Sequence, residues 1–383
     1  MRIEQLTAND FEEAMDFMNM VFGAHGPHDF ANLLPALYQP TDELMKCIWA
    51  IRESGRIVAI VGSHPLEWKV LSATLNLSGI GGVSSHPKRR GKGYMQELMK
   101  HCVDEMHSNG VHASWLGGQR QRYGYYGYEK CGVTYEYNLS KNNLRHVFGK
   151  AKSNITFRPL DQLDNTHLKS IADLHATNSI RRIRPINHFD TILRSWNNVP
   201  YIVIGSDGRM IGYIVASSDK SSIVELTGVS EGKPAFEIAR AWTEQQPGSS
   251  VRFDLPPWHE LLTPLGNIAE SYSIHNSGNW LILDWESTVD ALLNARLSIT
   301  KLNEGRVVIE IISQGRFALQ IDSEGATCKK SEDDADISID AAAAHRLLFG
   351  PLPPETIVPS CEALYTLSQW CPLPLSWSRQ DAV

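Results

Sequence analysis

The sequence predicts a mixed α/β (α+β) protein with three consecutive parts, and three observations carry this prediction. Strand-like and helix-like segments alternate over residues 1–285, which favours mixed central sheets covered by helices. Residues 54–60 (SGRIVAI) are similar to residues 207–213 (DGRMIGY), so the first two parts are expected to be repeats of one fold. After residue 285 the pattern changes to helices around a group of strands, which indicates a separate α+β part.

Composition places the chain among ordinary globular proteins. It has 383 residues, enough for roughly two to four domains, with 42% hydrophobic and 21% charged residues. No apolar run approaches the ~18 residues of a transmembrane helix, and the N-terminus lacks the apolar core of a signal peptide. The six cysteines include no CxxC pair and are too few for a disulfide scaffold. We therefore expect a soluble protein of the reducing cytoplasm that has no membrane partner.

The charge distribution argues against nucleic acid as a partner. The net charge is −7, and residues 286–383 hold 8 Lys and Arg against 14 Asp and Glu. Two basic clusters interrupt this pattern, at residues 86–92 and 120–122. Local positive charge in an otherwise neutral region suits a small polyanionic ligand.

The elements of the first part follow from hydrophobic spacing. A short strand precedes a capping box formed by Thr7 and Asp10, after which apolar residues repeat at helical spacing through residue 22. Residues 23–40 have no clear period and are expected to face a ligand. The polar stretch 142–153 is expected to be a linker. Further expected elements are strands at 48–51, 56–62, 68–77, 77–83, 113–116 and 133–139, and a helix at 92–109 stopped by Gly110.

The second and third parts are interpreted in the same way. A strand at 223–230 and a helix at 233–243 parallel the strand, loop and helix of the first part. The second part lacks the glycine-rich basic loop described next, so any duplicated site is expected to be inactive there. The third part is expected to contain helices at 288–297 and 341–349 and strands at 307–312, 317–321 and 335–339.

The loop that opens the helix at 92–109 has the features of an anion site. A glycine-bearing strand (GIGGV, residues 79–83) runs through Pro87 into RGKGYM, residues 90–95. Backbone N–H groups at a helix N-terminus favour an anion, and glycines let a phosphate approach the backbone closely. Together with Arg89, this loop is predicted to hold a pyrophosphate. It is neither a Walker loop nor a Rossmann fingerprint, and the alternative interpretation is an exposed basic turn.

These residues resemble a known family. Arg90-x-x-Gly93 after the glycine-bearing strand resembles the coenzyme A motif of GNAT acyltransferases. Met95, in place of the usual final Gly or Ala, is typical of the Eis (enhanced intracellular survival) branch, and residues 123–128 (YGYYGY) are similar to that branch's YGRFGY motif. The resemblance implies a homo-oligomer, a hexamer in the family. It also implies three domains: a catalytic GNAT domain at 1–150, a degenerate second GNAT domain at 151–285 and a sterol-carrier-like domain at 286–383.

The resemblance implies acetyl-CoA as the acetyl donor. Backbone amides of Val83 and Ser85 would hold the pantetheine and polarise the thioester, as a glycine-loosened strand allows, although an ordinary β-bulge is the alternative. The amides of residues 91–96 would hold the pyrophosphate. No metal is expected, because the histidine pairs have no third ligand at a usable spacing. The coenzyme-binding residues implied are Val83, Ser84, Ser85, Arg90, Gly91, Lys92, Gly93, Tyr94, Met95 and Gln96.

Tyr123 matches the general acid of the family. A phenol of pKa about 10 can protonate the departing coenzyme A thiolate, and Tyr123 lies four residues before Gly127, as the motif requires. Core packing is the alternative role. The family's Ser-Glu pair is replaced by Gly-Gln at residues 118–119, so Arg120 and Arg122 are expected to reach phosphate instead. Three nearby tyrosines compete for the acid role: Tyr125, Tyr126 and Tyr128.

In the Eis family the chain's own terminal carboxylate acts as the base, and the matching group here is the carboxylate of Val383. Residues 370–383 contain two prolines and two tryptophans, so we expect an extended apolar segment packed against the N-terminal domain. A frayed polar end at 378–383 is the alternative. Three side chains compete for the role of base: His28, Asp29 and His64.

The sequence therefore predicts an N-acetyltransferase that moves an acetyl group from acetyl-CoA to a primary amine by direct attack, with Tyr123 as the acid and the Val383 carboxylate as the base. The resemblance suggests an aminoglycoside or another small polyamine as the acceptor. A protein lysine acetyltransferase is the alternative enzyme. A non-catalytic acyl-CoA-binding or lipid-binding protein is the alternative of a different class.

Overall fold

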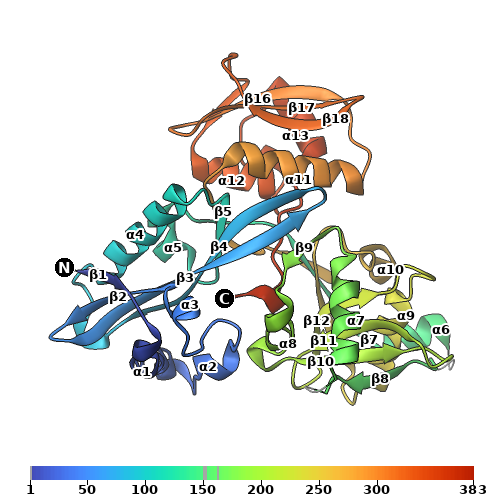
Figure 1. The fold of residues 1–383 in the computed structure, drawn as a ribbon. Helices are drawn as coiled ribbons and strands as arrows, with labels where there is room; N and C mark the ends of the chain where they lie inside the picture. The colour runs from blue at the N-terminus through green and yellow to red at the C-terminus, as the bar shows by residue number, and fades with distance from the viewer. Residues whose placement is uncertain (1, 150–152, 162–163) are drawn as a thin grey trace. The chain divides into compact units, whose positions relative to one another are not determined.

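The computed structural model describes residues 2–149, 153–161 and 164–383, which form two compact units (Figure 1). Unit 1 comprises the chain up to Gly132 together with Gly278–Leu373 and Ala382–Val383. Unit 2 comprises Val133–Ser277 and Pro374–Asp381. None of the helices in the described ranges is long and apolar enough to cross a membrane.

A mixed sheet forms the centre of unit 1. Its strands lie in the order β1-β2-β3-β4-β5-β15-β6. β4 and β5 run parallel, and the other neighbours pair antiparallel, as expected for a mixed sheet. The strands are β1 (Ile3–Gln5), β2 (Ile48–Glu53), β3 (Arg56–Val70), β4 (Ala73–Ser85), β5 (Ala113–Leu116), β15 (Gly278–Ile282) and β6 (Glu129–Cys131).

β3 and β4 form one long hairpin, which differs from the shorter strands expected at 68–77 and 77–83 (Figure 1). The two strands stay paired up to Val70 and Ala73, and the chain turns at Leu71, whose φ is +54°. Ser72 is the one residue of a type favoured in turns at the position where the chain reverses, and no Gly, Pro, Asn or Asp accompanies it, so the turn signal in the sequence is weak.

Two long helices cover this sheet. α1 (Phe11–Phe22) follows the predicted capping box, in which an Asp10 carboxylate oxygen accepts from the Thr7 backbone N–H and hydroxyl, each at 2.8 Å. α4 (Tyr94–Ser108) begins two residues later than expected, because Gly93 is left-handed (φ +80°) and caps the helix instead of continuing it. The shorter helices of this part are α2 (Phe30–Leu33), α3 (Asp42–Met45) and α5 (Arg120–Tyr123).

Unit 2 repeats the topology of unit 1. Its sheet has the order β14-β7-β13-β12-β11-β10-β8, and its β12–β13 pair is parallel, as β4–β5 is in unit 1. The hairpin turns of the repeated motif match as well, since Gly55 and Gly208 both have φ of +79°. The strands are β7 (Thr134–Ser140), β8 (Thr156–Pro159), β10 (Val199–Ile204), β11 (Met210–Ala216), β12 (Ser222–Gly228), β13 (Ser250–Leu255) and β14 (Tyr272–His275).

Each of the two sheets contains one strand from the other repeat. β7 follows the first repeat along the chain but pairs with β13 and β14. β15 follows the second repeat but pairs with β5 and β6. The unit boundaries therefore differ from the domain boundaries expected at 150/151, which lies outside the described residues, and at 285/286. Hydrophobic patterns reveal strands but not their partners, so this exchange leaves no trace in the sequence.

Helix α6 (Lys141–Phe148) occupies residues 142–148 of the stretch expected to be a linker, so that part of the expectation is wrong, and residues 150–152 of the stretch lie outside the described residues. Ser140 Oγ accepts from the Asn143 backbone N–H at 3.0 Å, and Asn143 Oδ1 accepts from the Ser140 N–H at 3.1 Å. This reciprocal cap, together with the buried Leu144, stabilises a short polar helix. The remaining elements of unit 2 are α7 (Asn165–Ala176), β9 (Ile180–Ile183), α8 (Phe189–Leu193), α9 (Ala235–Gln245) and α10 (Leu262–Gly266).

A second sheet of unit 1 comes from the last part of the chain, where an α+β arrangement was expected. Its strands lie in the order β18-β17-β16-β19. Helix α11 is bonded to the edge strand β18, because Asn294 donates to the Ala326 carbonyl and Asp290 accepts from the Cys328 N–H, each at 2.8 Å. The elements are α11 (Trp285–Ile299), β16 (Gly305–Ile311), β17 (Gly315–Asp322), β18 (Gly325–Lys330), β19 (Ile337–Ile339), α12 (Ala341–Phe349) and α13 (Glu362–Trp370).

The C-terminal segment is buried, which excludes the frayed end considered above. Trp377, Gln380 and Asp381 are 4%, 1% and 4% exposed. Gln380 accepts a hydrogen bond from Asn198 at 2.9 Å, and Asp381 accepts from Arg184 at 2.8 and 2.9 Å. The chain is therefore anchored within unit 2 up to residue 381.

Candidate active site

Strand β4 opens at a bulge beside the residues expected to hold the coenzyme. The register of β3 against β4 shifts between Ile60 and Gly62, so Gly82 and Val83 together oppose one residue. Gly82 has φ of +61°, a left-handed conformation that favours glycine. Pairing with β5 ends at Ile80. The bulge weighed as an alternative is thus present, and it releases this stretch of backbone from the ladder.

The C-terminus of the chain lies against the same strand. A Cβ built on Gly79 would lie 2.5 Å from a methyl carbon of Val383, and one built on Gly81 would lie 2.9 Å from its carboxyl carbon. Neither glycine has a positive φ, so close packing rather than backbone conformation requires glycine here. These two positions make room for the terminal residue because they lack side chains.

Two buried side chains, Tyr38 and His64, lie in the surroundings of this carboxylate. The Tyr38 hydroxyl would be 3.6 Å from a Cβ on Gly81 and 2.9 Å from one on Gly82. The rings of Tyr38 and His64 meet edge to face, with centroids 5.6 Å apart. Burial raises the pKa of Tyr38 well above its usual range, so the phenol is neutral and can donate a hydrogen bond.

The start of α4 forms an open cradle of backbone groups. Gly91 and Gly93 have φ of +81° and +80°, and a Cβ on either would have no atom within 4 Å. Because Gly93 is the N-cap, the N–H groups that follow at residues 94–96 have no acceptor inside the helix. This arrangement fits the anion site predicted from the sequence, since open backbone and the helix dipole together suit a pyrophosphate.

Glu53, at the end of β2, anchors the basic side chains of this cradle, and the sequence analysis missed it. It accepts from Arg89 Nε at 2.7 Å and Lys92 Nζ at 2.9 Å, and also from the Tyr94 hydroxyl. The Lys92 hydrogen bond is the main cause that lowers the pKa of Glu53. The signal that could have revealed it is its place before the repeated turn, where the second repeat has the neutral Ser206.

The tyrosine-rich segment contains one buried candidate acid. Tyr123 is 6% exposed, and burial raises the pKa of its phenol. A Cβ on Gly118 would lie 2.7 Å from the Tyr123 ring, so glycine makes room for this ring. Tyr125 is 88% exposed, and the Tyr128 hydroxyl is bonded to Ser114 at 2.7 Å inside the core. These two tyrosines are therefore weaker candidates for the acid.

The structure places Tyr123 in one apolar cluster with some of the residues expected to hold the coenzyme, but Val383 is not in that cluster. Val383 packs against the cluster of α1, which is a different one. The Tyr123 cluster includes Ile80 of β4, and Val383 lies against Gly79 and Gly81 of the same strand, on which the thioester is expected to lie. Tyr126 is half-buried on the Tyr123 cluster and remains the competing acid. Three of the residues expected to hold the coenzyme, Val83, Tyr94 and Met95, belong to this cluster.

Comparison with known proteins agrees with this geometry. Residues 2–131 match the family model of the acetyltransferase (GNAT) domain. These residues form a GNAT acetyltransferase domain. No curated protein matches the chain at a significant level.

Three solved structures extend the likeness beyond the GNAT domain. A probable N-acyltransferase from Enterococcus faecalis V583 is 18% identical, with 96% of each chain covered and a TM-score of 0.68. A GCN5-related N-acetyltransferase from Kribbella flavida is 16% identical, with 100% of this chain and 98% of that chain covered and a TM-score of 0.67. Eis1 from Mycobacterium abscessus is 14% identical, with 100% and 99% covered and a TM-score of 0.67. The predicted multi-domain mixed α/β fold is therefore confirmed.

Within the GNAT domain, Arg120 does not have the expected freedom to reach phosphate. Its guanidinium donates to Glu129, including a bond from Nη2 at 2.6 Å, and Arg346 donates to the same carboxylate at 2.9 Å. These two cations counteract burial and lower the pKa of Glu129. Arg346 is far away in sequence, so the local basic cluster could not show this pairing. Arg90, by contrast, has an exposed side chain at the cradle.

The competing bases of the GNAT domain differ in their surroundings. Asp29 caps α2 by accepting from the Asn32 N–H at 3.2 Å, and His28 stacks on Phe22. Both therefore have structural roles. His64 pairs along the ladder with Gly79, next to the terminal residue, so it is the competitor that lies in the site.

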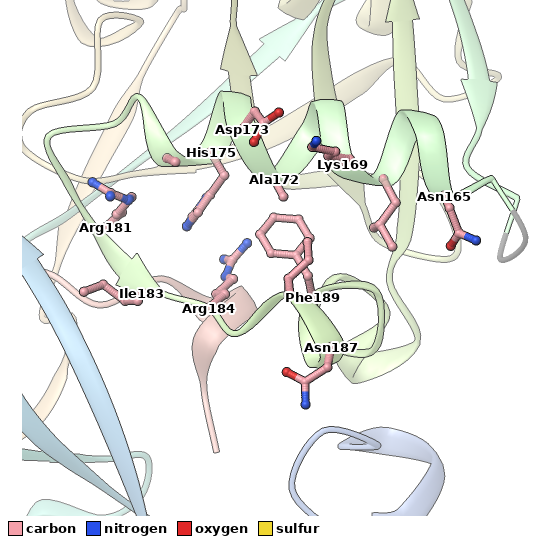
Figure 2. Close-up of a pocket in the computed structure, with 13 residues that line it drawn as sticks. Asn165, Lys169, Ala172, Asp173, His175, Arg181, Ile183, Arg184, Asn187 and Phe189 are labelled. Atoms are coloured by element: carbon pink, nitrogen blue, oxygen red, sulfur yellow. The ribbon is translucent and has the colours of Figure 1, made fainter.

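Unit 2 does not repeat the cradle. Its matching helix α9 has Pro234 at the N-cap, where α4 has Gly93, and proline has no N–H to offer an anion. Unit 2 instead has a cavity of about 560 Å³ between α7 and the segment around α8 (Figure 2). Phe189, Arg184 and His175 are among the side chains that line it.

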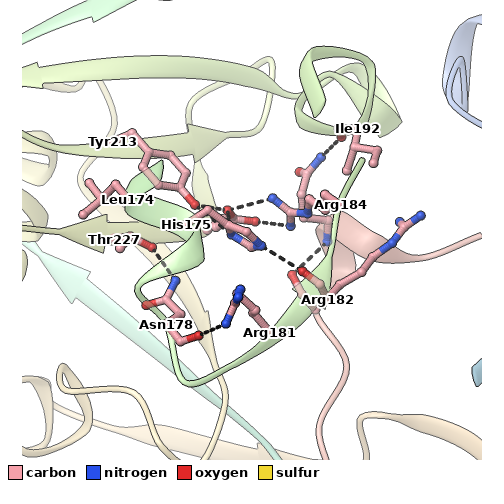
Figure 3. A network of polar contacts seen from close by, with 12 residues as sticks. Leu174, His175, Asn178, Arg181, Arg182, Arg184, Ile192, Tyr213 and Thr227 are labelled. Carbon is pink, nitrogen blue, oxygen red and sulfur yellow. Dashed lines mark hydrogen bonds and ion pairs between the residues drawn. The ribbon is translucent and has the colours of Figure 1, made fainter. Parts of the chain in front are cut away.

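A buried ion network lies beside this cavity and holds the C-terminal segment (Figure 3). Arg184, whose side chain is 1% exposed, donates to Glu225 at 3.0 Å and to Asp381. The Tyr213 hydroxyl also donates to Glu225, and His175 contacts Tyr213 at 3.2 Å. Arg184 lowers the pKa of Glu225 against the effect of burial. Nothing in the sequence pattern of the individual elements indicated this network.

Among the residues that the structure describes, no group of three His, Cys, Asp or Glu side chains could hold a metal ion. The six cysteines are free thiols. The groups that the structure places at the candidate site include backbone amides, the phenols of Tyr38 and Tyr123, the imidazole of His64 and the terminal carboxylate.

Proposed function

We propose that the chain is an acetyl-CoA-dependent N-acetyltransferase that acts on a primary amine. The observation that carries the proposal is the position of the Val383 carboxyl carbon, 2.9 Å from where a Cβ of Gly81 would lie, beside the bulge of β4. In a GNAT domain this strand is the expected place of the thioester, so a carboxylate packed into a space made by two glycines is suited to serve as a base.

Acetyl-CoA supplies the acetyl group as an activated thioester. The amides of residues 91–96 would hold its pyrophosphate, with Arg90 adding charge, and Val83, Ser84 and Ser85 would hold its pantetheine arm. The open backbone at the two cradle glycines fits this group, because a side chain there would occupy the approach.

Two groups of the chain would move protons. The Val383 carboxylate accepts a proton from the acceptor amine, so that the nitrogen lone pair can attack the acetyl carbon. Tyr123 donates its phenol proton to the departing thiolate sulfur, and burial keeps this phenol protonated at neutral pH. Collapse of the tetrahedral intermediate releases the second proton of the nitrogen, which restores the phenol, and the Val383 carboxyl group gives its proton to solvent.

We propose a small cationic amine, such as an aminoglycoside or another polyamine, as the acceptor, because a terminal carboxylate attracts positive charge. The resemblance to the Eis family also supports a homo-oligomer. A lysine side chain of a protein offers the same amine chemistry and is the second candidate.

The experiment is thiol release from acetyl-CoA in the presence of a panel of amines, with mass spectrometry of the products. The proposal predicts release that depends on the acceptor and one acetyl group gained for each thiol released. Acetylation of peptides but of no small amine would favour the lysine acetyltransferase. Binding of acetyl-CoA without transfer to any acceptor would contradict the enzyme and favour a non-catalytic acyl-CoA-binding protein.

A further inference from the structure

Two of the cations in the loop predicted to hold the pyrophosphate are already bound to a carboxylate of the chain. Arg89 Nε donates to one oxygen of Glu53 at 2.7 Å, and Lys92 Nζ donates to the other at 2.9 Å. The Tyr94 hydroxyl donates to the same carboxylate, and Lys92 Nζ lies 5.8 Å from the centroid of the Tyr94 ring. The Lys92 side chain is therefore held against the end of β2 and the first residue of α4.

Glu53 binds these side chains with the chemistry that a phosphate would use. Carboxylate and phosphate oxygens are both anionic acceptors for ammonium and guanidinium donors. The Glu53 carboxylate thus takes one donor of Arg89 and one of Lys92, and it neutralises positive charge that the phosphates of a coenzyme would otherwise meet. A negative charge at an anion site opposes binding of the anion, so its presence there needs an explanation.

The hairpin turn next to Glu53 does not require a carboxylate. The second repeat has Ser206 at the matching position, and its turn glycine, Gly208, has the same φ of +79° as Gly55. The second repeat has also lost the cradle, since Pro234 stands at the N-cap of its helix. The carboxylate and the cradle are thus present together in one repeat and absent together in the other, which links Glu53 to the cradle rather than to the turn.

The contacts of Glu53 are of a kind that a stronger anion can replace. The side chains of Arg89 and Lys92 are 44% and 49% exposed, and that of Glu53 is 27% exposed. Exposed ion pairs are weak, because water screens them and long side chains lose freedom in forming them. A pyrophosphate carries more negative charge than one carboxylate does, so it attracts the same two cations more strongly.

A contact that weakens coenzyme binding is useful to an enzyme that must release coenzyme A. The product coenzyme A keeps the pyrophosphate of acetyl-CoA, so every contact in the cradle binds substrate and product alike. Tight contacts there would slow the departure of the product, a step that limits turnover in many enzymes. A carboxylate that takes the cations back would speed this step.

We propose that Glu53 is an internal competitor of the coenzyme for Arg89 and Lys92. Its carboxylate holds the two cations when the cradle is empty, yields them to the phosphates when the coenzyme binds, and takes them back as coenzyme A leaves. Glu53 touches no reacting atom in this scheme and sets the affinity for the coenzyme. The inference rests on the proposed function, in which the cradle binds the pyrophosphate of acetyl-CoA.

The first test measures the Kd for coenzyme A by calorimetry and its dissociation rate by stopped flow. Glu53→Gln keeps the shape of the side chain and removes its charge, so it should tighten binding about 3- to 10-fold, mainly through slower dissociation. Glu53→Ser, which copies Ser206 of the second repeat, should act in the same direction. Unchanged or weaker binding in both variants would refute the proposal, and weaker binding would show that the carboxylate positions the cations for the ligand.

Glu4→Gln is the matched control for the loss of one negative charge. Glu4 accepts from Arg52 Nε at 2.7 Å, next to Glu53 in the chain, and its side chain is 31% exposed. Because Arg52 lies outside the cradle, Glu4→Gln should leave the Kd for coenzyme A unchanged. A gain in affinity equal to that of Glu53→Gln would show that only the net charge matters, and it would overturn the proposal.

The second test repeats Glu53→Gln in a background that carries Arg89→Gln and Lys92→Gln. If Glu53 acts by holding these two cations, its replacement should change the Kd for coenzyme A very little in this background. The same gain as in the wild-type background would show that Glu53 repels the phosphates directly, which would contradict the proposal.

Binding and acetyl transfer are measured on the same proteins, so the two proposals fail separately. If the wild type binds coenzyme A but transfers no acetyl group to any amine, the proposed function fails, and the comparison of Kd values still decides the role of Glu53. If the wild type transfers acetyl groups while Glu53→Gln does not tighten the binding of coenzyme A, the inference about Glu53 is wrong and the proposed function stands. A wild type that does not bind coenzyme A would overturn both.

Discussion

Replacing Gly81 with alanine should displace the terminal carboxylate without altering any proposed catalytic group. The new Cβ would lie 2.9 Å from the Val383 carboxyl carbon and 3.3 Å from a carboxyl oxygen, well inside the optimal separation of ~3.5–4.0 Å between carbons. Gly81 does not have a left-handed backbone, so the substitution adds no conformational strain. The chain end must therefore move by about 1 Å, and a misplacement of that size can lower turnover on the order of 10²-fold.

The assay for Gly81→Ala is acceptor-dependent thiol release, measured together with the KM for acetyl-CoA and the Tm. We expect kcat to fall about 10²-fold. The KM should be unchanged, and the loss of stability should be about 1 kcal/mol, the low end for overpacking, because a chain end can yield. Gly23→Ala is the control, since its Cβ would meet no atom within 4 Å, and it should keep full activity. Full kcat in Gly81→Ala would refute the role of the carboxylate, and an equal loss in Gly23→Ala would show that the effect is not specific.

Three further predictions concern the cradle, the acid and the pH dependence of folding. Arg90→Ala combined with Gly93→Ala should raise the KM for acetyl-CoA ~10-fold or more and leave that for the amine nearly unchanged, and an unaltered acetyl-CoA affinity would contradict the anion site. Tyr123→Phe should lower kcat ~10²-fold with an unchanged Tm, and the same loss in Tyr126→Phe alone would move the acid there. Burial lowers the pKa of His345 to about 4, so the unfolded chain binds more protons than the folded one between about pH 6.5 and 4. The Tm should accordingly fall as the pH drops through that window, and less steeply in His345→Gln; equal slopes would show that His345 does not contribute.

Features that depend on neighbouring residues could be predicted from the sequence. The capping box of Thr7 and Asp10 needs only a spacing of three residues, and the glycines at 91 and 93 need only their place before a helix. The buried faces of α1 and α4 follow from the same local periodicity.

Features that depend on contacts between distant residues could not be predicted. β7 lies more than a hundred residues along the chain from both of its partner strands, and so does β15. The hydrophobic pattern of a strand does not indicate which strand it pairs with. Glu53 looked like part of an ordinary turn until the fold brought Arg89 and Lys92 to it. The glycines 79 and 81 were interpreted as loosening a strand, whereas in the structure they make room for Val383.

The central claim is that the carboxylate of Val383 is the base, and deletion of Val383 alone tests it most directly. A longer deletion would also remove Asp381 and leave the buried Arg184 without one of its two carboxylates. Deleting one residue keeps that ion pair and moves the terminal carboxylate back by about 3.8 Å, one residue along the chain. The account predicts that kcat falls ~10²-fold or more, while the KM for acetyl-CoA and the Tm stay near their wild-type values. Full turnover by the shortened chain would contradict it and transfer the role of base to His64 or to another group.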